Sequence, residues 1–277
     1  MKDPKILYIL IAVFCVFAII AGIYAQFIEG GSRTSSTKQN NNVIIEKDAE
    51  TVKEELNSLF TNIVNLNEYD TTGIKKINGE KEIVYTAFDI NKDEEAFEIN
   101  IKVPAFNINN EVASSFNEIT QVNFVNKASE VLAHKDVTKK IIYSIEYAGF
   151  VNGDILSVII RSTLKNGSSA QRVIIQTYNY NLATGTKVNL TDLITWKALN
   201  KEDVNQKIKK VVQEADEEAK AVQSMGYNEV YTRDLTDTKY TVEGSSTYFL
   251  GPNNNLYIIY PYGNKDFTSE MDIVLFE

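Results

Sequence analysis

Apolar residues form one uninterrupted stretch near the start of the chain. The 23 residues from Ile6 to Ile28 carry no formal charge. About 20 consecutive apolar residues are needed to cross the core of a bilayer as a helix, so this run is long enough to span a membrane. We therefore expect residues 1–29 to form a membrane anchor that tethers the rest of the chain.

A cleavable secretory signal is the alternative interpretation of the same run. Its apolar core is usually shorter, roughly 7 to 15 residues, and ends at a small-x-small site, which the residues around Ala25 match poorly. Lys2 and Lys5 make the N-terminal flank positive against Asp3 alone, and a positive flank favours the cytoplasmic side. We expect an uncleaved single-pass anchor in the cell membrane, with residues 30–277 outside the cytoplasm.

The pattern changes twice after the anchor. Residues 30–45 are rich in Gly, Ser and Asn, which predicts a polar linker. Residues 46–70 carry apolar side chains at three- and four-residue steps, the period of an amphipathic helix, with Asp48 as its N-cap. Its apolar stripe consists of Val52, Leu56, Leu59, Phe60, Ile63 and Val64. We expect this helix to dock on the domain that follows, rather than to form a coiled coil, for which it has too few heptads.

Extended segments and two helices are predicted within residues 82–277. Two β-rich stretches flank a polar tip at residues 91–95 and predict a hairpin, and three more within residues 141–182 predict an antiparallel meander. Helices are predicted near residues 109–132 and 200–226, and short strands follow them. The apolar face of the first helix consists of Val112, Phe116, Ile119, Val122, Val125 and Leu132. This order predicts an α+β domain, an antiparallel β-sheet with helices packed on one face, preceded by one N-terminal transmembrane helix.

Charge and cysteine content narrow the possible partners. The chain has 28 Lys and Arg against 37 Asp and Glu, a net charge of -9, which opposes binding to nucleic acid or to an anionic membrane surface. Its only cysteine, Cys15, lies inside the apolar run, so the segment after the anchor has no disulfide, no thiolate zinc site and no cysteine nucleophile. We expect no nucleic-acid partner and no cofactor.

Few side chains are suited to catalysis. His134 is the only histidine and ends a predicted helix, where a positive charge is favourable, so we expect a surface role for it. Ser162 and Lys165 match S-x-x-K, but in a strand an odd offset sends two side chains to opposite faces. Paired carboxylates for glycan hydrolysis stay open, because acidic residues are abundant and their separation in space is not visible in a sequence. We expect a non-catalytic protein.

One segment matches the start of a calcium-binding loop. Asp89, Asn91 and Asp93 have the D-x-N-x-D spacing, but such loops need Gly at the sixth position and Glu at the twelfth. This chain has Glu94 and Asn100 there. Because the flanking segments are predicted strands, we expect a charged hairpin and no metal site.

Aromatic residues near the C-terminus are the candidate ligand-binding residues. They are Tyr248, Tyr257, Tyr260 and Tyr262. Alternation along the predicted strands would bury one set and expose the other, and exposed tyrosines are well suited to contact a glycan or a protein.

Residues 82–277 resemble a known bacterial family. The matching stretches are KVPAFNINNEVASSFNEI at 102–119, GDILSVII at 153–160, YNYNLATGTKVNLTDLI at 178–194 and YFLGPNNNLYIIYPYG at 248–263. Taken in this order, they resemble a bacterial extracytoplasmic domain family of unknown function, found in the ectodomain of the lysozyme-sensing anti-sigma factor and as the non-catalytic domain of a peptidoglycan deacetylase. The resemblance implies a helix-covered antiparallel sheet that binds or senses something in the envelope without doing chemistry.

The chain departs from that family in two places. A turn where the family often has two glycines, an alanine and a histidine reads NGSSAQ at residues 166–171, so any role of that histidine is absent. Five residues precede the apolar run, too few for a cytoplasmic sigma-binding helix, so we expect no anti-sigma activity.

Together these features predict a membrane-anchored extracytoplasmic binding or sensing module of the bacterial cell envelope. Its expected partners are the membrane, through residues 6–28, and an envelope protein or a cell-wall glycan as ligand. Two alternatives stay open: an enzyme that acts on cell-wall glycan through paired carboxylates, and a structural subunit of an envelope complex.

Overall fold

The computed structural model describes residues 47–227, 230–262 and 270–277. Residues 47–277 form one compact unit, so the segment from 47 to 81 belongs with the domain that we predicted from residue 82 onward. The predicted anchor and the predicted linker lie outside the described residues. In the part of the chain that is described, no helix combines the length and the apolar character needed to cross a bilayer.

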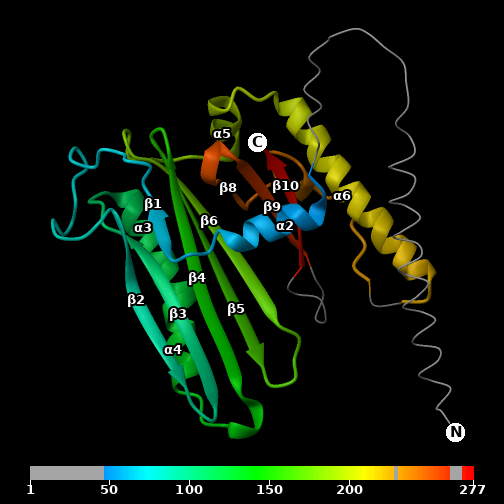
Figure 1. The fold of residues 1–277 in the computed structure, drawn as a ribbon, viewed down its shortest axis with the longest axis horizontal. Helices are drawn as coiled ribbons and strands as arrows, with labels where there is room; N and C mark the ends of the chain where they lie inside the picture. The colour runs from blue at the N-terminus through cyan, green and yellow to red at the C-terminus, as the bar shows by residue number, and fades with distance from the viewer. Residues whose placement is uncertain (1–46, 228–229, 263–269) are drawn as a thin grey trace, which may run out of the picture. The chain divides into compact units, whose positions relative to one another are not determined.

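Seven strands form a large sheet (Figure 1). They are β1 (Ile63–Asn65), β2 (Val84–Asp93), β3 (Phe97–Phe106), β4 (Ile141–Asn152), β5 (Ile155–Asn166), β6 (Arg172–Asn181) and β7 (Thr186–Lys187). The order is β2-β3-β4-β5-β6-β7, and β1 also pairs with β4. The predicted hairpin and meander are confirmed as β2–β3 and β4–β6. The sheet is mixed rather than purely antiparallel, because β4 pairs in parallel with both β3 and β1.

The two parallel neighbours of β4 lie one after the other along the same edge. The β3–β4 ladder covers Phe97–Ile101 only, and Pro104, farther along β3, has no N–H to donate. Beyond that point β1 occupies the same edge of β4, at residues 148–150. Asn62 bonds to β4 between the β3 and β1 ladders. Its backbone N–H donates to the Tyr147 carbonyl at 2.7 Å, and its Oδ1 accepts the Tyr147 N–H at 3.1 Å.

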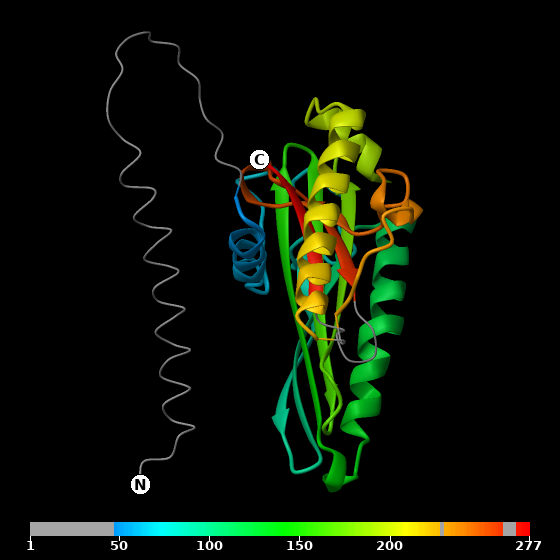
Figure 2. The same ribbon diagram turned by 90° about the vertical axis from the view of Figure 1, so that its right-hand side faces the viewer.

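One long helical segment covers a face of the large sheet (Figure 2). It comprises α3 (Glu111–Thr120), the π-helical turn η1 (Gln121–Val125) and α4 (Asn126–Leu132). Asn110 caps this segment, because its Oδ1 accepts the Ala113 N–H at 2.8 Å. Because a π turn closes over five residues, it shifts the helical phase. The predicted apolar face is wrong at Ile119 and Val122, which are 43% and 56% exposed, because the buried face of α3 runs through Ala113, Phe116 and Thr120 and continues at Phe124 in η1.

A second sheet of three antiparallel strands packs on the other face of the large sheet. It consists of β8 (Tyr248–Leu250), β9 (Leu256–Tyr262) and β10 (Glu270–Phe276). Phe249 and Ile259 join a buried cluster with Phe150 of β4 and Ile159 of β5. Further helices, α5 (Leu190–Trp196) and α6 (Lys201–Ser224), cover its outer side, where their residues share a second cluster with it.

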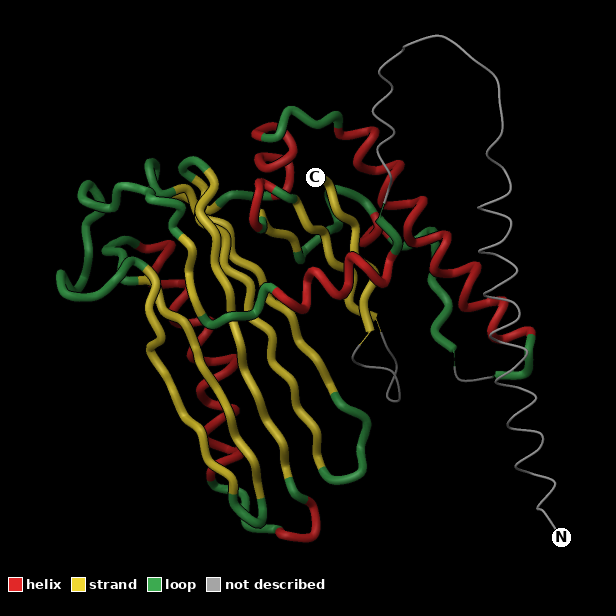
Figure 3. Tube along the Cα trace, viewed as in Figure 1, coloured by secondary structure: helices red, strands yellow, loops and turns green. Residues whose placement is uncertain are grey.

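The described part of the chain is therefore a stack of helix, sheet, sheet and helix (Figure 3). The α+β class is confirmed, but helices cover both outer sides rather than one face of a single sheet. Three short 3₁₀ turns complete the connections: η2 (Val137–Lys139), η3 (Thr238–Tyr240) and η4 (Pro252–Asn254).

The predicted amphipathic helix is shorter than residues 46–70. It forms α2 (Ala49–Ser58), capped as predicted by Asp48, whose Oδ1 accepts the Thr51 N–H at 2.8 Å. Val52 and Leu56 are buried against both sheets, so docking on the domain is confirmed for them. The second half of the prediction is wrong, because the left-handed backbone at Asn62 (φ 58°) ends the turn and the β-branched residues after it form β1.

Candidate functional site

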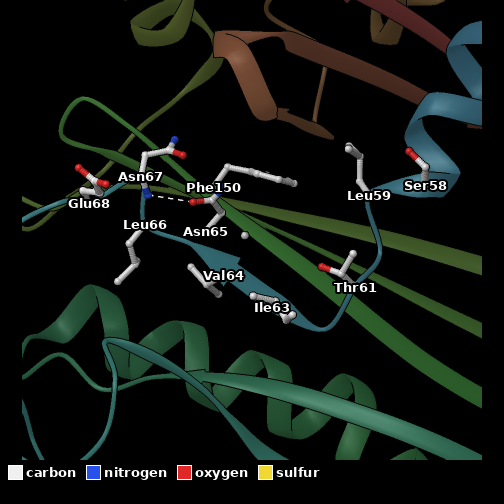
Figure 4. A pocket seen from close by; sticks show the side chains of 11 residues that line it. Ser58, Leu59, Thr61, Ile63, Val64, Asn65, Leu66, Asn67, Glu68 and Phe150 are labelled. Carbon is white, nitrogen blue, oxygen red and sulfur yellow. Dashed lines mark hydrogen bonds between the residues drawn. The ribbon is translucent and has the colours of Figure 1, made fainter.

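An open cavity of about 610 Å³ lies beside β1 (Figure 4). The lining residues come from the end of α2, from β1 and the loop after it, and from β4: Ser58, Leu59, Thr61, Ile63, Val64, Asn65, Leu66, Asn67, Glu68, Gly149 and Phe150. The end of α2 and the loop after β1 form walls beside the paired strands β1 and β4. Apolar side chains and uncharged amides or hydroxyls thus share one open depression, a combination typical of binding sites.

Hydrogen bonds and close packing fix β1 in place at the cavity. Asn67 donates from Nδ2 to the Val151 carbonyl at 2.6 Å, while Asn65 Oδ1 accepts the Asn67 N–H at 2.9 Å. A Cβ at Gly149 would lie 2.8 Å from a methyl carbon of Val64, so only glycine lets β1 approach β4 this closely. Together with the Asn62–Tyr147 bonds, these contacts make the cavity preformed.

The cavity has an acidic rim. Among the described residues that line it, Glu68 is the only charged one, and none is Lys or Arg. Beside it, the Tyr69 hydroxyl donates to Asp154 Oδ1 at 3.0 Å, which ties the loop after β1 to the β4–β5 turn. Burial raises the pKa of the Tyr69 phenol and the hydrogen bond to Asp154 raises it further, so the phenol stays neutral and keeps donating. This electrostatic arrangement favours a neutral or cationic ligand.

Backbone strain is concentrated at the same loop. Asn67 and Glu68 have φ angles of 48° and 62°, in the left-handed region that a glutamate rarely occupies. Such strained residues cluster at ligand sites, where the surrounding structure holds them in place. This site was not predicted from the sequence, because the apolar spacing predicts a helix through residues 61–67. The signal was present in the three asparagines of TNIVNLN, since asparagine is a poor helix former that tolerates the left-handed backbone.

The four predicted tyrosines do not come together as an exposed platform. Tyr257 and Tyr260 are 1% and 5% exposed and belong to two different buried clusters, as their odd spacing on β9 requires. The Tyr260 hydroxyl is also hydrogen-bonded to Ser245 Oγ at 2.6 Å. Tyr248 is half-buried on β8, and the side chain of Tyr262 lies outside the described residues. Tyr257 and Tyr260 are thus core residues rather than binding residues.

The other catalytic candidates have structural surroundings. His134 Nε2 lies 3.0 Å from the carbonyl oxygens of Asp136 and Lys139, so the ring donates into the turn before β4. Ser162 is buried on β5, whereas Lys165 is exposed on the opposite face of the strand, as its odd offset predicted.

The segment that matches the start of a calcium-binding loop forms the end of strand β2. Asp93 pairs with Lys140 at 2.6 Å, and Asp89 lies 4.0 Å from Lys102 on the neighbouring strand. The predicted charged hairpin is confirmed. Among residues 47–227, 230–262 and 270–277, no three His, Cys, Asp or Glu side chains are grouped so that they could hold a metal ion.

Comparisons with known proteins find similarity at the level of solved structures. No protein-family model matches the chain, and no curated protein matches it. A DUF3298 family protein from Pseudomonas aeruginosa PAO1 is 12% identical, with a TM-score of 0.37 over 66% of this chain and 82% of that chain. Another from Bacteroides fragilis NCTC 9343 is 15% identical, with a TM-score of 0.36 over 65% of this chain and 79% of that chain. The chain is thus similar, over about two thirds of its length, to two bacterial proteins from a domain family of unknown function.

Proposed function

We propose that this protein is a non-catalytic binding module of the bacterial cell envelope, tethered to the membrane and outside the cytoplasm, that holds a protein ligand in the β1 cavity. The observation that carries the proposal is the cavity itself, preformed between α2, β1 and β4. Its lining offers amides, hydroxyls and apolar surface, which suit recognition. The single carboxylate of its lining, Glu68, has no second acid in that lining for paired-carboxylate hydrolysis.

The acidic rim favours a protein over a cell-wall glycan. Peptidoglycan strands carry carboxylates on their stem peptides, and these would meet Glu68 with no Lys or Arg in the lining to balance them. A protein segment that is neutral or cationic meets no such repulsion. The extracytoplasmic placement is supported by the uncharged run Ile6–Ile28 and by the family resemblance of residues 82–277.

Site-specific crosslinking tests this proposal. A photoreactive p-benzoylphenylalanine replaces Ile63, which is 64% exposed and lines the cavity; in a matched control it replaces Ile174, which is 55% exposed on β6 and is not a lining residue. In cells of the bacterium that makes the protein, we expect a protein adduct from position 63 and none from position 174. Equal adducts from both positions, or none from either, would contradict the proposal.

Two further assays separate the alternatives. If purified cell walls pull down the full chain and position 63 gives no protein adduct, the ligand is a glycan. If the chain releases soluble wall fragments and Glu68→Gln stops that release, the protein is an enzyme. Ser58→Trp is designed to fill the cavity. If membrane proteins still co-purify with this variant in fixed stoichiometry, the protein is a structural subunit.

A further inference from the structure

An exposed tryptophan lies at the same end of the molecule as the cavity. Trp196, the only tryptophan of the chain, ends α5 and is 41% exposed. Large aromatic side chains are usually buried, and tryptophan is enriched among the residues that dominate binding energy at protein interfaces. Figure 1 shows α5, the loop after β1 and the turn between β4 and β5 together at one end of the large sheet.

Direct contacts connect the indole to the cavity rim. A Cβ on Gly153, in the β4–β5 turn, would lie 3.5 Å from the Trp196 ring, so the indole rests against this turn. The next residue, Asp154, accepts the Tyr69 hydroxyl, and Glu68 of the cavity lining directly precedes Tyr69. The indole therefore lies against the β4–β5 turn, and this turn is bonded to the loop that carries Glu68 of the cavity lining.

The β4–β5 turn and the loop bonded to it each carry a carboxylate. Asp154 and Glu68 are exposed carboxylates. Lys197, the residue after Trp196, is directed to the opposite segment: its ammonium donates to the Asn254 carbonyl at 2.7 Å. An indole face is the best aromatic acceptor for a cation, and a guanidinium is the side chain most often found on it. Carboxylates beside the ring add direct electrostatic attraction for the same group.

We infer that Trp196, Asp154 and Glu68 form a cation-binding surface that takes an arginine or lysine side chain of the bound protein segment. This inference rests on the proposed function and adds the chemistry of the partner: a cationic segment, one of whose basic side chains stacks on the indole while its neighbours enter the β1 cavity. The net charge of -9 attracts such a partner at long range and accelerates its association at low ionic strength.

A designed peptide provides the probe. The heptapeptide Gly-Arg-Gly-Arg-Gly-Arg-Gly is compared with the same peptide carrying citrulline, a neutral isostere, at each arginine. Binding to the purified full chain is followed by the emission of its single tryptophan and by calorimetry. The arginine peptide is expected to change the emission and to bind at least about tenfold more tightly than the citrulline peptide.

Matched variants distinguish binding at this specific surface from general attraction between an acidic protein and a basic peptide. Asp154→Asn keeps the acceptor for Tyr69 and removes one charge, and it should weaken binding about threefold or more. Glu130→Gln removes one charge from an exposed position on α4, and it should leave the affinity for the peptide within about 1.5-fold. Trp196→Ala should weaken binding about tenfold, with partial recovery in Trp196→Phe. Equal binding of the citrulline peptide, or equal losses in Asp154→Asn and Glu130→Gln, would overturn the inference.

The crosslinking assay distinguishes this inference from the proposed function. A protein adduct at position 63 that forms with the same yield in Trp196→Ala would reject the cation surface and leave the cavity as the binding site. Loss of the adduct in Trp196→Ala, but not in Glu130→Gln, would support both. If the wild-type background gives no adduct, the proposed function fails whatever the peptide does.

Discussion

The two halves of the central strands β4 and β5 differ in how many of their faces are covered. The upper half consists of Tyr147–Asn152 of β4 and Ile155–Ile160 of β5, and the lower half consists of Ile141–Glu146 and Arg161–Asn166. On β4, all residues from Tyr147 to Asn152 are buried, whereas those from Ile141 to Glu146 alternate between buried and accessible. On β5, all residues from Ile155 to Ile160 are buried, whereas from Arg161 onward only Ser162 is buried. The helical segment α3–α4 covers one face along the strands, while α2 and the second sheet cover the other face of the upper half only. Burial of both faces therefore depends on segments distant in sequence.

The largest expected effect comes from one face of β5. Ile159 and Thr163 point to the same side of the sheet, but only Ile159 lies under the second sheet. Ile159→Ala should lower the free energy of unfolding by about 2–5 kcal/mol, because it leaves a cavity between two packed layers. Thr163→Ala should cost less than about 1 kcal/mol. Denaturant unfolding measures both; similar losses would show that the cover of the upper half contributes little.

The attachment of β1 to the upper half depends on Gly149. Gly149→Ala places a methyl group 2.8 Å from the Val64 side chain, so β1 must shift away from β4. We expect a loss of about 1–3 kcal/mol, the usual cost of overpacking. The matched change Ala148→Gly at the neighbouring position creates no such clash. If Gly149→Ala retains both stability and the crosslink at position 63, β1 is not held as tightly as its packing indicates.

A polar cluster, rather than apolar packing alone, attaches the outermost layer. Asp216 of α6 is buried, accepts the Arg233 N–H at 2.8 Å and pairs with Lys220 at 2.6 Å. Arg233 also forms a two-point ion pair with buried Asp272. Burial acts to raise the pKa of Asp216, but its bonds to Lys220 and Arg233 outweigh burial and hold that pKa below its usual value.

The depressed pKa gives a pH-dependent test with a defined sign. An aspartate whose folded-state pKa is lowered contributes stability above its unfolded pKa of about 4 and loses that contribution as pH falls through the folded value. Asp216→Asn should therefore cost about 1–2 kcal/mol at pH 7, and the gap between variant and wild type should narrow below about pH 4. A gap that stays constant down to pH 3 would contradict the role of this carboxylate.

Local patterns predicted the elements better than their packing. The hairpin, the meander and the capped helices follow from turn residues and periodicity that a sequence displays directly. Ile119 and Val122 are exposed because the buried face of the helical segment includes Ala113 and Thr120, a small and a polar residue that the spacing of large apolar residues does not indicate. Likewise, the strand at Ile63 forms where the β3–β4 ladder has ended and left an edge of β4 open, far away in sequence.

The same limit explains why the sequence showed neither the burial of Tyr257 and Tyr260 nor the cavity. Tyr257 and Tyr260 alternate as strand residues should, but a second layer lies on each side of β9, so both are buried. The cavity depends on α2, β1 and β4 meeting in space. Only its asparagines and the solitary Trp196 were visible as local features, and neither has a recognised binding motif.

The central claim is that the partner binds beside β1, at the upper half of the central strands. Hydrogen exchange tests this claim most directly. Exchange rates of backbone amides are compared in the full chain with and without the arginine peptide. We predict slower exchange in residues 58–70 and 152–155, which carry the cavity and its acidic rim. We predict unchanged exchange in residues 161–173, which belong to the lower half of β5 and the turn after it. Slowing confined to residues 161–173, or no slowing anywhere at saturating peptide, would contradict the account.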